Sequence, residues 1–175
     1  METWDAIRSR RNVREYTDQP IAEADLERIL DAGRRSPSSM NRQRWDFVVV
    51  TGRDRLTELA TVWMGARHVP GSAATVALVG PAENDPRTRE SINFDMGQAA
   101  MSMLIVAADL GIASCHAAVG DHARAARVLG LPGDRQCLWL LAFGYPADRP
   151  LTPMRRPTRR AFDDVVHRDR FSGGP

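Results

Sequence analysis

The chain has 175 residues, of which 43% are hydrophobic and 26% are charged. This length predicts a single domain over residues 1–175 that can bury a core without disulfides or a structural metal. The formal net charge is +2, and acidic and basic residues are mixed along the sequence. Such a balance argues against a polybasic arm, so we expect no nucleic-acid partner.

The hydrophobic pattern predicts where in the cell the protein is located. No stretch reaches the roughly 18 apolar residues of a membrane span, so we expect no membrane partner. The N-terminal sequence METWDAIRSRR lacks the apolar run of a signal peptide, which favours a cytoplasmic location. All 24 basic residues are arginine. Any anion must therefore be bound by guanidinium groups, which suit bidentate contacts with phosphate.

Helices and strands alternate along the first half of the chain. A short helix is expected over residues 2–9, with Trp4 and Ile7 facing inward, and a clearer one over 22–35. Pro37 then opens a loop.

The segments that follow continue this alternation. The aromatic and β-branched run WDFVVV predicts a strand over residues 45–50. A helix is expected over 53–63, with Trp63 on its apolar face, and a strand over 74–79.

The longest predicted helix covers residues 91–110. Its second half is apolar nearly all round, so full burial would be easier if a second subunit covered part of it. Gly111 should cap it. The expected elements after it are a strand over 112–119, a helix over 121–129 with Asp121 as N-cap, and a strand over 136–143.

The last predicted strand, QCLWLLAF, is apolar on both faces and should be central. Residues 147–175 are rich in proline and arginine and poor in large apolar groups, so they cannot fold alone and must lie on the body or on a partner subunit. The two cysteines, Cys115 and Cys137, lie in apolar runs and should be buried free thiols. The four histidines show no metal-ligand spacing, so no metal site is expected.

Polar groups gather in three segments. The N-terminal segment Ser9-Arg10-Arg11-Asn12-Val13-Arg14 could form a compact anion site, or be a solvated basic stretch. The loop 37–45, PSSMNRQRW, could hydrogen-bond a polyol or the edge of a heterocycle, or be ordinary turn chemistry. The basic group 155–160 could complete a phosphate site, or be a solvated tail.

Taken in order, these segments resemble the nitroreductase family of FMN-dependent oxidoreductases. The matching stretches, which span nearly the whole chain, are RRNVR at 10–14, PSSMNRQRW at 37–45, DMGQAAMSMLIVAADLG at 95–111, GYP at 144–146 and RRAFDDVV at 159–166. The chain departs from the family pattern at three positions. Asn12 replaces the usual Ser, Arg44 the usual Pro, and Ser102 a frequent Asn.

The resemblance implies an α+β fold with a mixed, mainly antiparallel sheet flanked by helices, in an intertwined homodimer. Residues 147–175 would form a C-terminal arm extending over the partner subunit. Each dimer would hold two FMN molecules at the interface.

The resemblance also assigns the cofactor-binding residues. The FMN phosphate and ribityl chain would be held by Arg10, Arg11, Asn12 and Arg14, with Arg159 and Arg160 approaching the same phosphate. The loop of the other subunit would add Pro37, Ser38, Ser39, Asn41 and Gln43, and the main chain at Ala118 and Val119 would lie near flavin N5.

The expected activity is hydride transfer from NADH or NADPH through FMN to a nitroaromatic, a quinone or a similar small acceptor, in ping-pong order. The flavin supplies the reactive atoms, so we expect no catalytic side chain. One alternative keeps the fold but changes the chemistry to dehydrogenation of a biosynthetic intermediate, dehalogenation or flavin cleavage. Another is a non-catalytic flavin-binding protein, and the three departures leave open a chain that has lost flavin.

Overall fold

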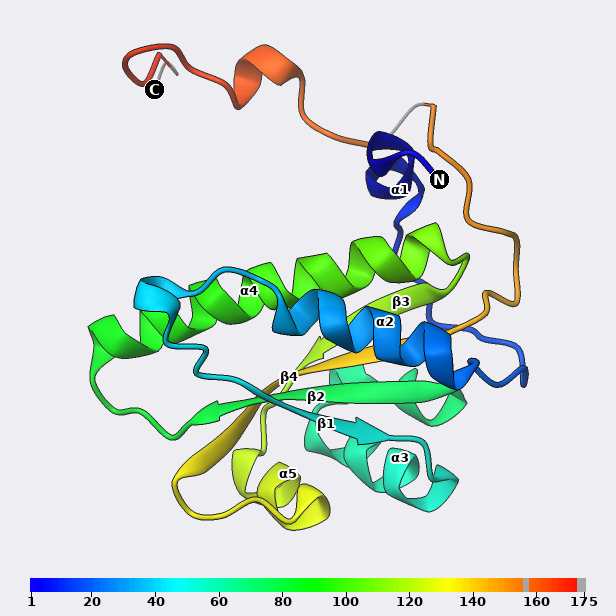
Figure 1. Cartoon of the computed structure of the whole chain (residues 1–175), viewed down its shortest axis with the longest axis vertical. Helices are drawn as coiled ribbons and strands as arrows, with labels where there is room; N and C mark the ends of the chain where they lie inside the picture. The colour runs from blue at the N-terminus through cyan, green and yellow to red at the C-terminus, as the bar shows by residue number, and fades with distance from the viewer. Residues whose placement is uncertain (156–157, 173–175) are drawn as a thin grey trace.

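A computed structural model describes residues 1–155 and 158–172, and these residues form helices around an antiparallel sheet (Figure 1). The α-helices are α1 Thr3–Ser9, α2 Glu23–Arg34, α3 Arg53–Leu59, α4 Pro86–Asp109 and α5 His122–Leu129. The strands are β1 Asp46–Val50, β2 Ala74–Pro81, β3 Ala113–Ala118 and β4 Arg135–Gly144. Short 3₁₀ helices cover Ser39–Asn41, Ala60–Val62, Met64–Ala66, Val69–Gly71 and Phe162–Asp164.

The strands lie in the order β1-β2-β4-β3, and each neighbouring pair is antiparallel. The expected sheet flanked by helices is confirmed, and β4 is central as predicted from its apolar sequence. The parallel component is an isolated bridge between Asn12 and Ser114. This bridge leaves β3 as an edge strand with the N-terminal segment beside its first residues.

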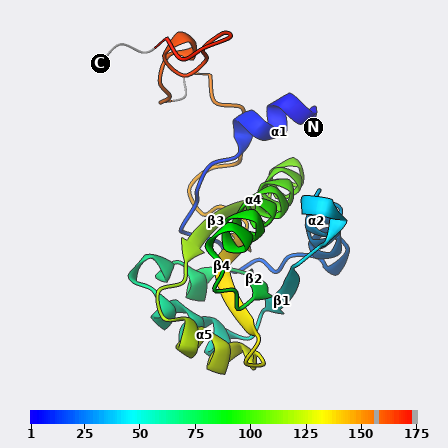
Figure 2. The ribbon, with the colours of Figure 1, turned by 90° about the vertical axis from the view of Figure 1, so that its left-hand side faces the viewer.

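Helices cover both faces of the sheet, with α2 and α4 on one side and α3 and α5 on the other (Figures 1 and 2). The core between the sheet and α2/α4 contains Ile29, Met103 and Phe143, which are fully buried. The core on the other face contains Leu56, Leu59 and Leu140. Because β2 and β4 are buried on both faces, their sequences are nearly continuous apolar runs.

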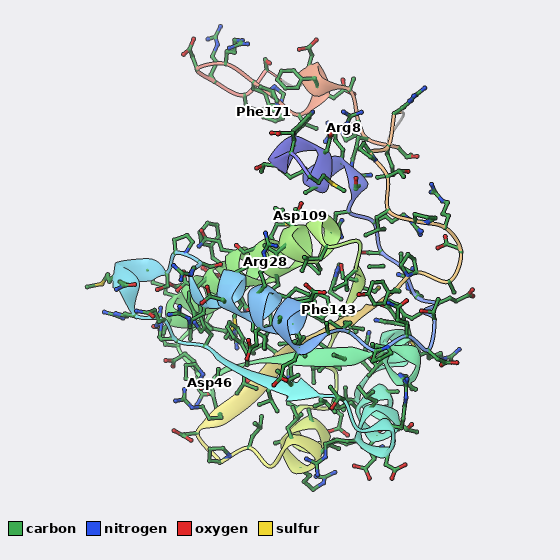
Figure 3. All side chains as sticks on the ribbon, turned by 45° about the vertical axis from the view of Figure 1, so that its right-hand side comes forward. Arg8, Arg28, Asp46, Asp109, Phe143 and Phe171 are labelled. Atoms are coloured by element: carbon green, nitrogen blue, oxygen red, sulfur yellow. The ribbon has the colours of Figure 1, made fainter. Side chains whose placement is uncertain are left out.

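Helix α1 and the C-terminal segment project from one end of this body (Figures 1 and 2). The N-terminal amine pairs with Asp109 at the end of α4 at 2.6 Å, which holds α1 against that end. Arg28 of α2 pairs with the same carboxylate at 3.5 Å (Figure 3). Trp4 and Ile7 do not face inward as expected, since 66% and 37% of their surface is exposed. Among the described residues, α1 buries only Ala6 and Ser9, and its outer face borders the C-terminal segment across an open cavity.

The helix boundaries differ from the predictions at two places. The helix expected over 53–63 ends at Leu59, and Trp63 is turned outward between two 3₁₀ helices with 44% of its surface exposed. The long helix starts at Pro86 rather than 91, because the Asp85 side chain caps it by accepting the Thr88 amide. The predicted cap at Asp121 is confirmed, as its side chain accepts the Arg124 amide.

Candidate functional site

The candidate site is built along the free edge of β3. Helix α1 ends at Ser9, and its C-cap residue Arg10 already has an extended backbone at φ −61° and ψ 123°. The chain then runs beside β3, where the Val13 amide donates to the Ser114 carbonyl at 3.0 Å. The N-terminal segment 10–14 therefore lies along the edge like a short added strand.

An extended backbone turns successive side chains to opposite sides, and the segment 10–14 follows this rule. Val13 points into the body and is 4% exposed, whereas Asn12 and Arg14 are exposed. Arg10 donates to the Asn12 side-chain oxygen at 3.0 Å, so both lie on the outer side. The outer set Arg10, Asn12 and Arg14 thus presents two guanidinium groups and a carboxamide together.

Arg11 does not belong to this outer set, because its guanidinium contacts other parts of the chain. Its guanidinium pairs with Asp148 at 2.7 Å and donates to the Arg149 carbonyl at 2.9 Å. The same contact holds the pKa of the Asp148 carboxyl below its ordinary value. Arg11 therefore ties the chain after β4 to the N-terminal segment. By contrast, Arg14 forms no ion pair or side-chain hydrogen bond with any residue that the structure describes.

Two predicted arginine groups from opposite ends of the sequence come together at Arg10. A cavity of 370 Å³ is lined by Arg10 and Arg159, together with Trp4, Ile7, Arg8, Met101, Met154 and Arg155. The Met154 amide donates to the Arg8 carbonyl at 3.1 Å and fixes the C-terminal segment there. Arg160 instead donates to the Asp164 carbonyl within the arm. Arg156 and Pro157, in the middle of this basic group, lie outside the described residues.

The far end of β3 provides main-chain groups. Ser114 directs its carbonyl outward to Val13, and the direction of main-chain groups alternates along a strand. The amides of His116 and Ala118 therefore face the same free edge. Beyond Ala118, the turn at Val119–Asp121 is held by Val62, whose carbonyl accepts the Gly120 and Asp121 amides at 3.1 and 2.9 Å.

His68 is buried behind this edge. It is 6% exposed, and neither ring nitrogen has a hydrogen-bond partner among the described residues. Burial lowers the pKa of His68 below 6.5, and the nearby positive charge of Arg14 acts in the same direction. A neutral imidazole at this place adds no positive charge behind Arg14.

The predicted loop after α2 is positioned by α4. The Ser39 amide donates to both oxygens of Asp95 at 3.0 and 3.2 Å, and Asp95 is only 3% exposed. Gln43 donates from its amide to the Ser38 hydroxyl at 2.9 Å and from its side chain to Asn41. Met40, Asn41 and Gln43 have positive φ angles of 54°, 53° and 48°. The loop, including the exposed Pro37, is thus shaped by its backbone around one buried carboxylate.

The departures from the family pattern have local partners. Arg44 donates to the Ser91 hydroxyl on α4 at 3.1 Å, and Ser102 accepts a hydrogen bond from Ser36 at 2.8 Å. Asn12 bonds with Arg10. Each substituted side chain is therefore accommodated by a contact within the chain.

Within one chain the loop and the outer arginines lie apart. Asp95 is on the buried side of α4, whereas Arg10 borders a second cavity of 270 Å³ with Gly97 and Met101 on the exposed side of that helix. The 3₁₀ helix of the loop and helix α1 also lie at different ends of the body (Figures 1 and 2). The structure brings Arg10, Asn12, Arg14 and Arg159 to one region and leaves the segment 37–43 in another.

The sequence did not predict the path of the segment 62–68, which runs beside β3 from Gly120 to Cys115. Val62 bonds to the turn at Gly120, and the ring of Trp63 lies against Gly120. At the other end His68 is beside Cys115 and Arg14. The apolar spacing through Trp63 instead predicted a continuous helix over 53–63. The glycines at 65 and 120 do not by themselves predict where the indole lies.

The described residues hold no helix long and apolar enough to cross a membrane. Cys115 and Cys137 are buried free thiols, as predicted. These features define an α+β protein with an arginine-lined site at the open edge of its sheet. A family model described as the nitroreductase family matches residues 7–66 and 62–145. The chain belongs to the nitroreductase family.

Individual relatives cover nearly the whole chain. A protein of Archaeoglobus fulgidus, provisionally named a NADH dehydrogenase/NAD(P)H nitroreductase, is 27% identical over 94% of this chain and 96% of its own. An FMN-dependent nitroreductase of Clostridium difficile superposes with a TM-score of 0.82 at 20% identity, covering 95% of this chain and 98% of the other. The NADPH:FMN oxidoreductase of Vibrio harveyi, solved with NAD⁺, gives a TM-score of 0.85 at 22% identity, covering 97% of this chain and 78% of the other.

Proposed function

We propose that the protein is an FMN-dependent oxidoreductase that takes hydride from NADH or NADPH and passes it to a small acceptor such as a nitroaromatic or a quinone. The observation that carries this proposal is the outer set Arg10, Asn12 and Arg14 at the edge of β3, with Arg159 on the same cavity as Arg10. Family membership supports it, as do relatives named FMN reductase in Bacillus subtilis and NADPH-flavin oxidoreductase in Vibrio harveyi.

The donor set suits the two chemically different ends of FMN. Guanidinium groups bind a phosphate through paired, charge-assisted hydrogen bonds, and the Arg14 guanidinium has no competing carboxylate among the described residues. The outward amides at the other end of β3 are hydrogen-bond donors for the edge of a heterocycle. We therefore assign Arg10, Asn12, Arg14 and Arg159 to the phosphate side and the main chain at Ala118 and Val119 to the ring side. Arg11 and Arg160 support the site from behind by ordering the arm.

The chemistry follows from this division of roles. FMN, when bound, supplies an atom that accepts and later donates hydride, and the two substrates react in turn in ping-pong order. The arginines bind and orient the phosphate end. Main-chain donors at Ala118 and Val119 would stabilise negative charge on a bound flavin ring, since fixed dipoles need no reorganisation. No side chain is assigned as nucleophile or general base.

A homodimer would complete the site with the loop 37–43 of a second subunit. Apolar side chains lie open on the surface that such a partner would cover: Phe94 and Met101 on α4 are 71% and 39% exposed. They are seven residues apart and so share one helix face. In the arm, Phe162 and Phe171 are 67% and 77% exposed, and the arm projects from the body (Figure 3). We propose that residues 147–175 extend over the partner, within a single domain of residues 1–175.

The direct test is whether the purified protein contains FMN that NADH or NADPH can reduce. The purified protein should be yellow, and NADH or NADPH should bleach its flavin absorption under anaerobic conditions. Adding a nitroaromatic or a quinone should then restore the absorption. A colourless protein that takes up no added FMN would refute the proposal, and a yellow protein that neither nucleotide reduces would favour a flavin-binding role or another flavin chemistry.

A further inference from the structure

Trp63 is held in an unusual position beside the end of β3. Its backbone is extended, at φ −163° and ψ 140°, between the 3₁₀ helices Ala60–Val62 and Met64–Ala66. This interruption turns the indole out of the core that holds Leu56 and Leu59. A large aromatic side chain with 44% of its surface exposed forgoes part of the stabilisation that full burial would supply.

Two glycines fix the plane of the indole. A Cβ atom added at Gly120 would lie 2.4 Å from the Trp63 ring, and one added at Gly65 would lie 2.9 Å from it. Gly120 is not among the residues with positive φ, so its backbone conformation does not require glycine. The close approach of the indole does require it. The ring is therefore seated on the β3–α5 turn before any ligand arrives.

The location of this ring relates it to the proposed cofactor site. Gly120 follows directly after Ala118 and Val119, and Val62 clamps the turn with two hydrogen bonds. Gly120 lies six positions along the chain from Ser114, which is beside the arginines, and six steps of extended strand span about 20 Å. Trp63 thus lies at the end of the edge that is remote from the phosphate-binding arginines.

We infer that Trp63 is a specificity-determining residue whose partly exposed indole stacks on a planar aromatic ring during turnover, and that this second ring belongs to the electron acceptor. The inference rests on the proposed function, because it places the acceptor next to the ring side of the cofactor site. Offset stacking between aromatic rings favours flat π-systems over small inorganic oxidants. The substrate class is accordingly a planar aromatic acceptor.

The test compares Trp63→Ala, Trp63→Phe and wild type as FMN-loaded protein. Flavin content per chain, read from absorbance, should be equal in all three. In oxidised protein without reductant, titration with para-nitrobenzoate should give a Kd about two- to tenfold weaker for Trp63→Ala, with recovery in Trp63→Phe. The KM for a nitroaromatic should rise in parallel, while ferricyanide reduction should be unchanged. Gly120→Ala should resemble Trp63→Ala, because the added methyl displaces the ring.

The outcomes separate this inference from the proposed function. Unchanged Kd and KM in a yellow Trp63→Ala protein would overturn the role of Trp63 and leave the flavin assignment intact. Loss of flavin in Trp63→Ala would also overturn it, since the ring would then act on the cofactor or the fold. A larger KM for NADH or NADPH with an unchanged acceptor KM would assign the stacking to nicotinamide and overturn the acceptor assignment. A wild-type protein that binds no flavin would refute the proposed function itself.

Discussion

The two polar segments assigned to the cofactor, 10–14 and 37–43, are built in opposite ways. The first is attached to β3 through its main chain and turns charged side chains outward. The second is attached to α4 by a single carboxylate that accepts a main-chain amide, and its shape depends on left-handed backbone at Met40, Asn41 and Gln43. The first segment therefore offers charge on a fixed support, whereas the second offers a shaped backbone. Removing charge should damage the first, and removing its anchor should damage the second.

The largest effect is expected when Arg10 and Arg14 are both replaced by alanine. Charge-assisted hydrogen bonds contribute roughly 1.5–3 kcal/mol each, so the double variant should bind FMN at least about a hundredfold more weakly. Each single variant should lose about tenfold. Fluorescence titration of FMN with apoprotein measures this directly, because bound and free flavin differ in emission.

A matched control for this loss is Arg127→Ala. Arg127 is an exposed arginine in the last turn of α5, away from the edge of β3. Arg127→Ala removes one positive charge, the same as each single variant, so it separates the loss of a local contact from a change in net charge. Equal FMN affinity in the double variant and in Arg127→Ala would disprove the phosphate assignment.

The second segment should fail when its anchor is removed. In Asp95→Ala the Ser39 amide loses its charged acceptor, and a hydrogen bond to a charged group contributes roughly 1.5–3 kcal/mol to the free energy of unfolding. The loop 37–43 should also lose its shape, so FMN affinity should fall even though Asp95 lies on the buried side of α4. Asp95→Asn keeps one acceptor oxygen and should retain most of both properties. Denaturant unfolding and FMN titration measure the two effects, and a stable Asp95→Ala protein with normal FMN affinity would contradict the proposed role.

The sequence was sufficient for the parts of the structure that local pattern and burial determine. The central position of β4 followed from its apolar run, and the start of α5 followed from Asp121. The different roles of Arg10 and Arg11 could not be predicted. Which arginine faces outward depends on the bridge between Asn12 and Ser114, a contact between residues about a hundred positions apart.

Two exposed tryptophans show a related limit of prediction from the sequence. Trp4 and Trp63 were assigned inward because helical spacing rewards burial, yet both are exposed. Trp4 instead borders an open cavity with the C-terminal segment at Met154 and Arg159. For Trp63, the helix ends four residues earlier and the glycines at 65 and 120 hold the ring outside. An apolar pattern predicts that a side chain will be covered, and it does not say whether the cover is the core, a second subunit or a ligand.

A smaller effect on FMN affinity is expected from a change in the projecting arm, and it tests whether two subunits form the site together. Replacing Phe162 by serine removes an exposed aromatic ring and should weaken the proposed homodimer, because burial of apolar area drives such association. Light scattering at decreasing protein concentration should show dissociation at higher concentration than in wild type, and FMN affinity should fall with it. Phe162→Leu should behave nearly as wild type. An unchanged dimer in Phe162→Ser, or a monomeric wild type, would contradict the arm's proposed contact.

The smallest expected effect concerns pH and His68. The folded state lowers the pKa of His68 below 6.5, so the unfolded chain takes up a proton first as the pH falls. Between about 6.5 and the lower pKa of the folded state the unfolded chain therefore binds more protons at this residue. The free energy of unfolding must decrease with decreasing pH in that window. Above about 6.5 both states are neutral, and this contribution does not depend on pH.

His68→Leu isolates this contribution from that of the carboxylates, which also titrate in acid. Leucine fills a similar volume without a titratable group, so the variant should lose less stability than wild type between pH 7.5 and 5. The difference between the two pH profiles, measured by denaturant unfolding, is the quantity of interest, since the carboxylate contribution cancels. Parallel profiles would mean that His68 is protonated as easily in the folded chain as in the unfolded one. The conclusion that the folded chain favours a neutral imidazole behind Arg14 would then be wrong.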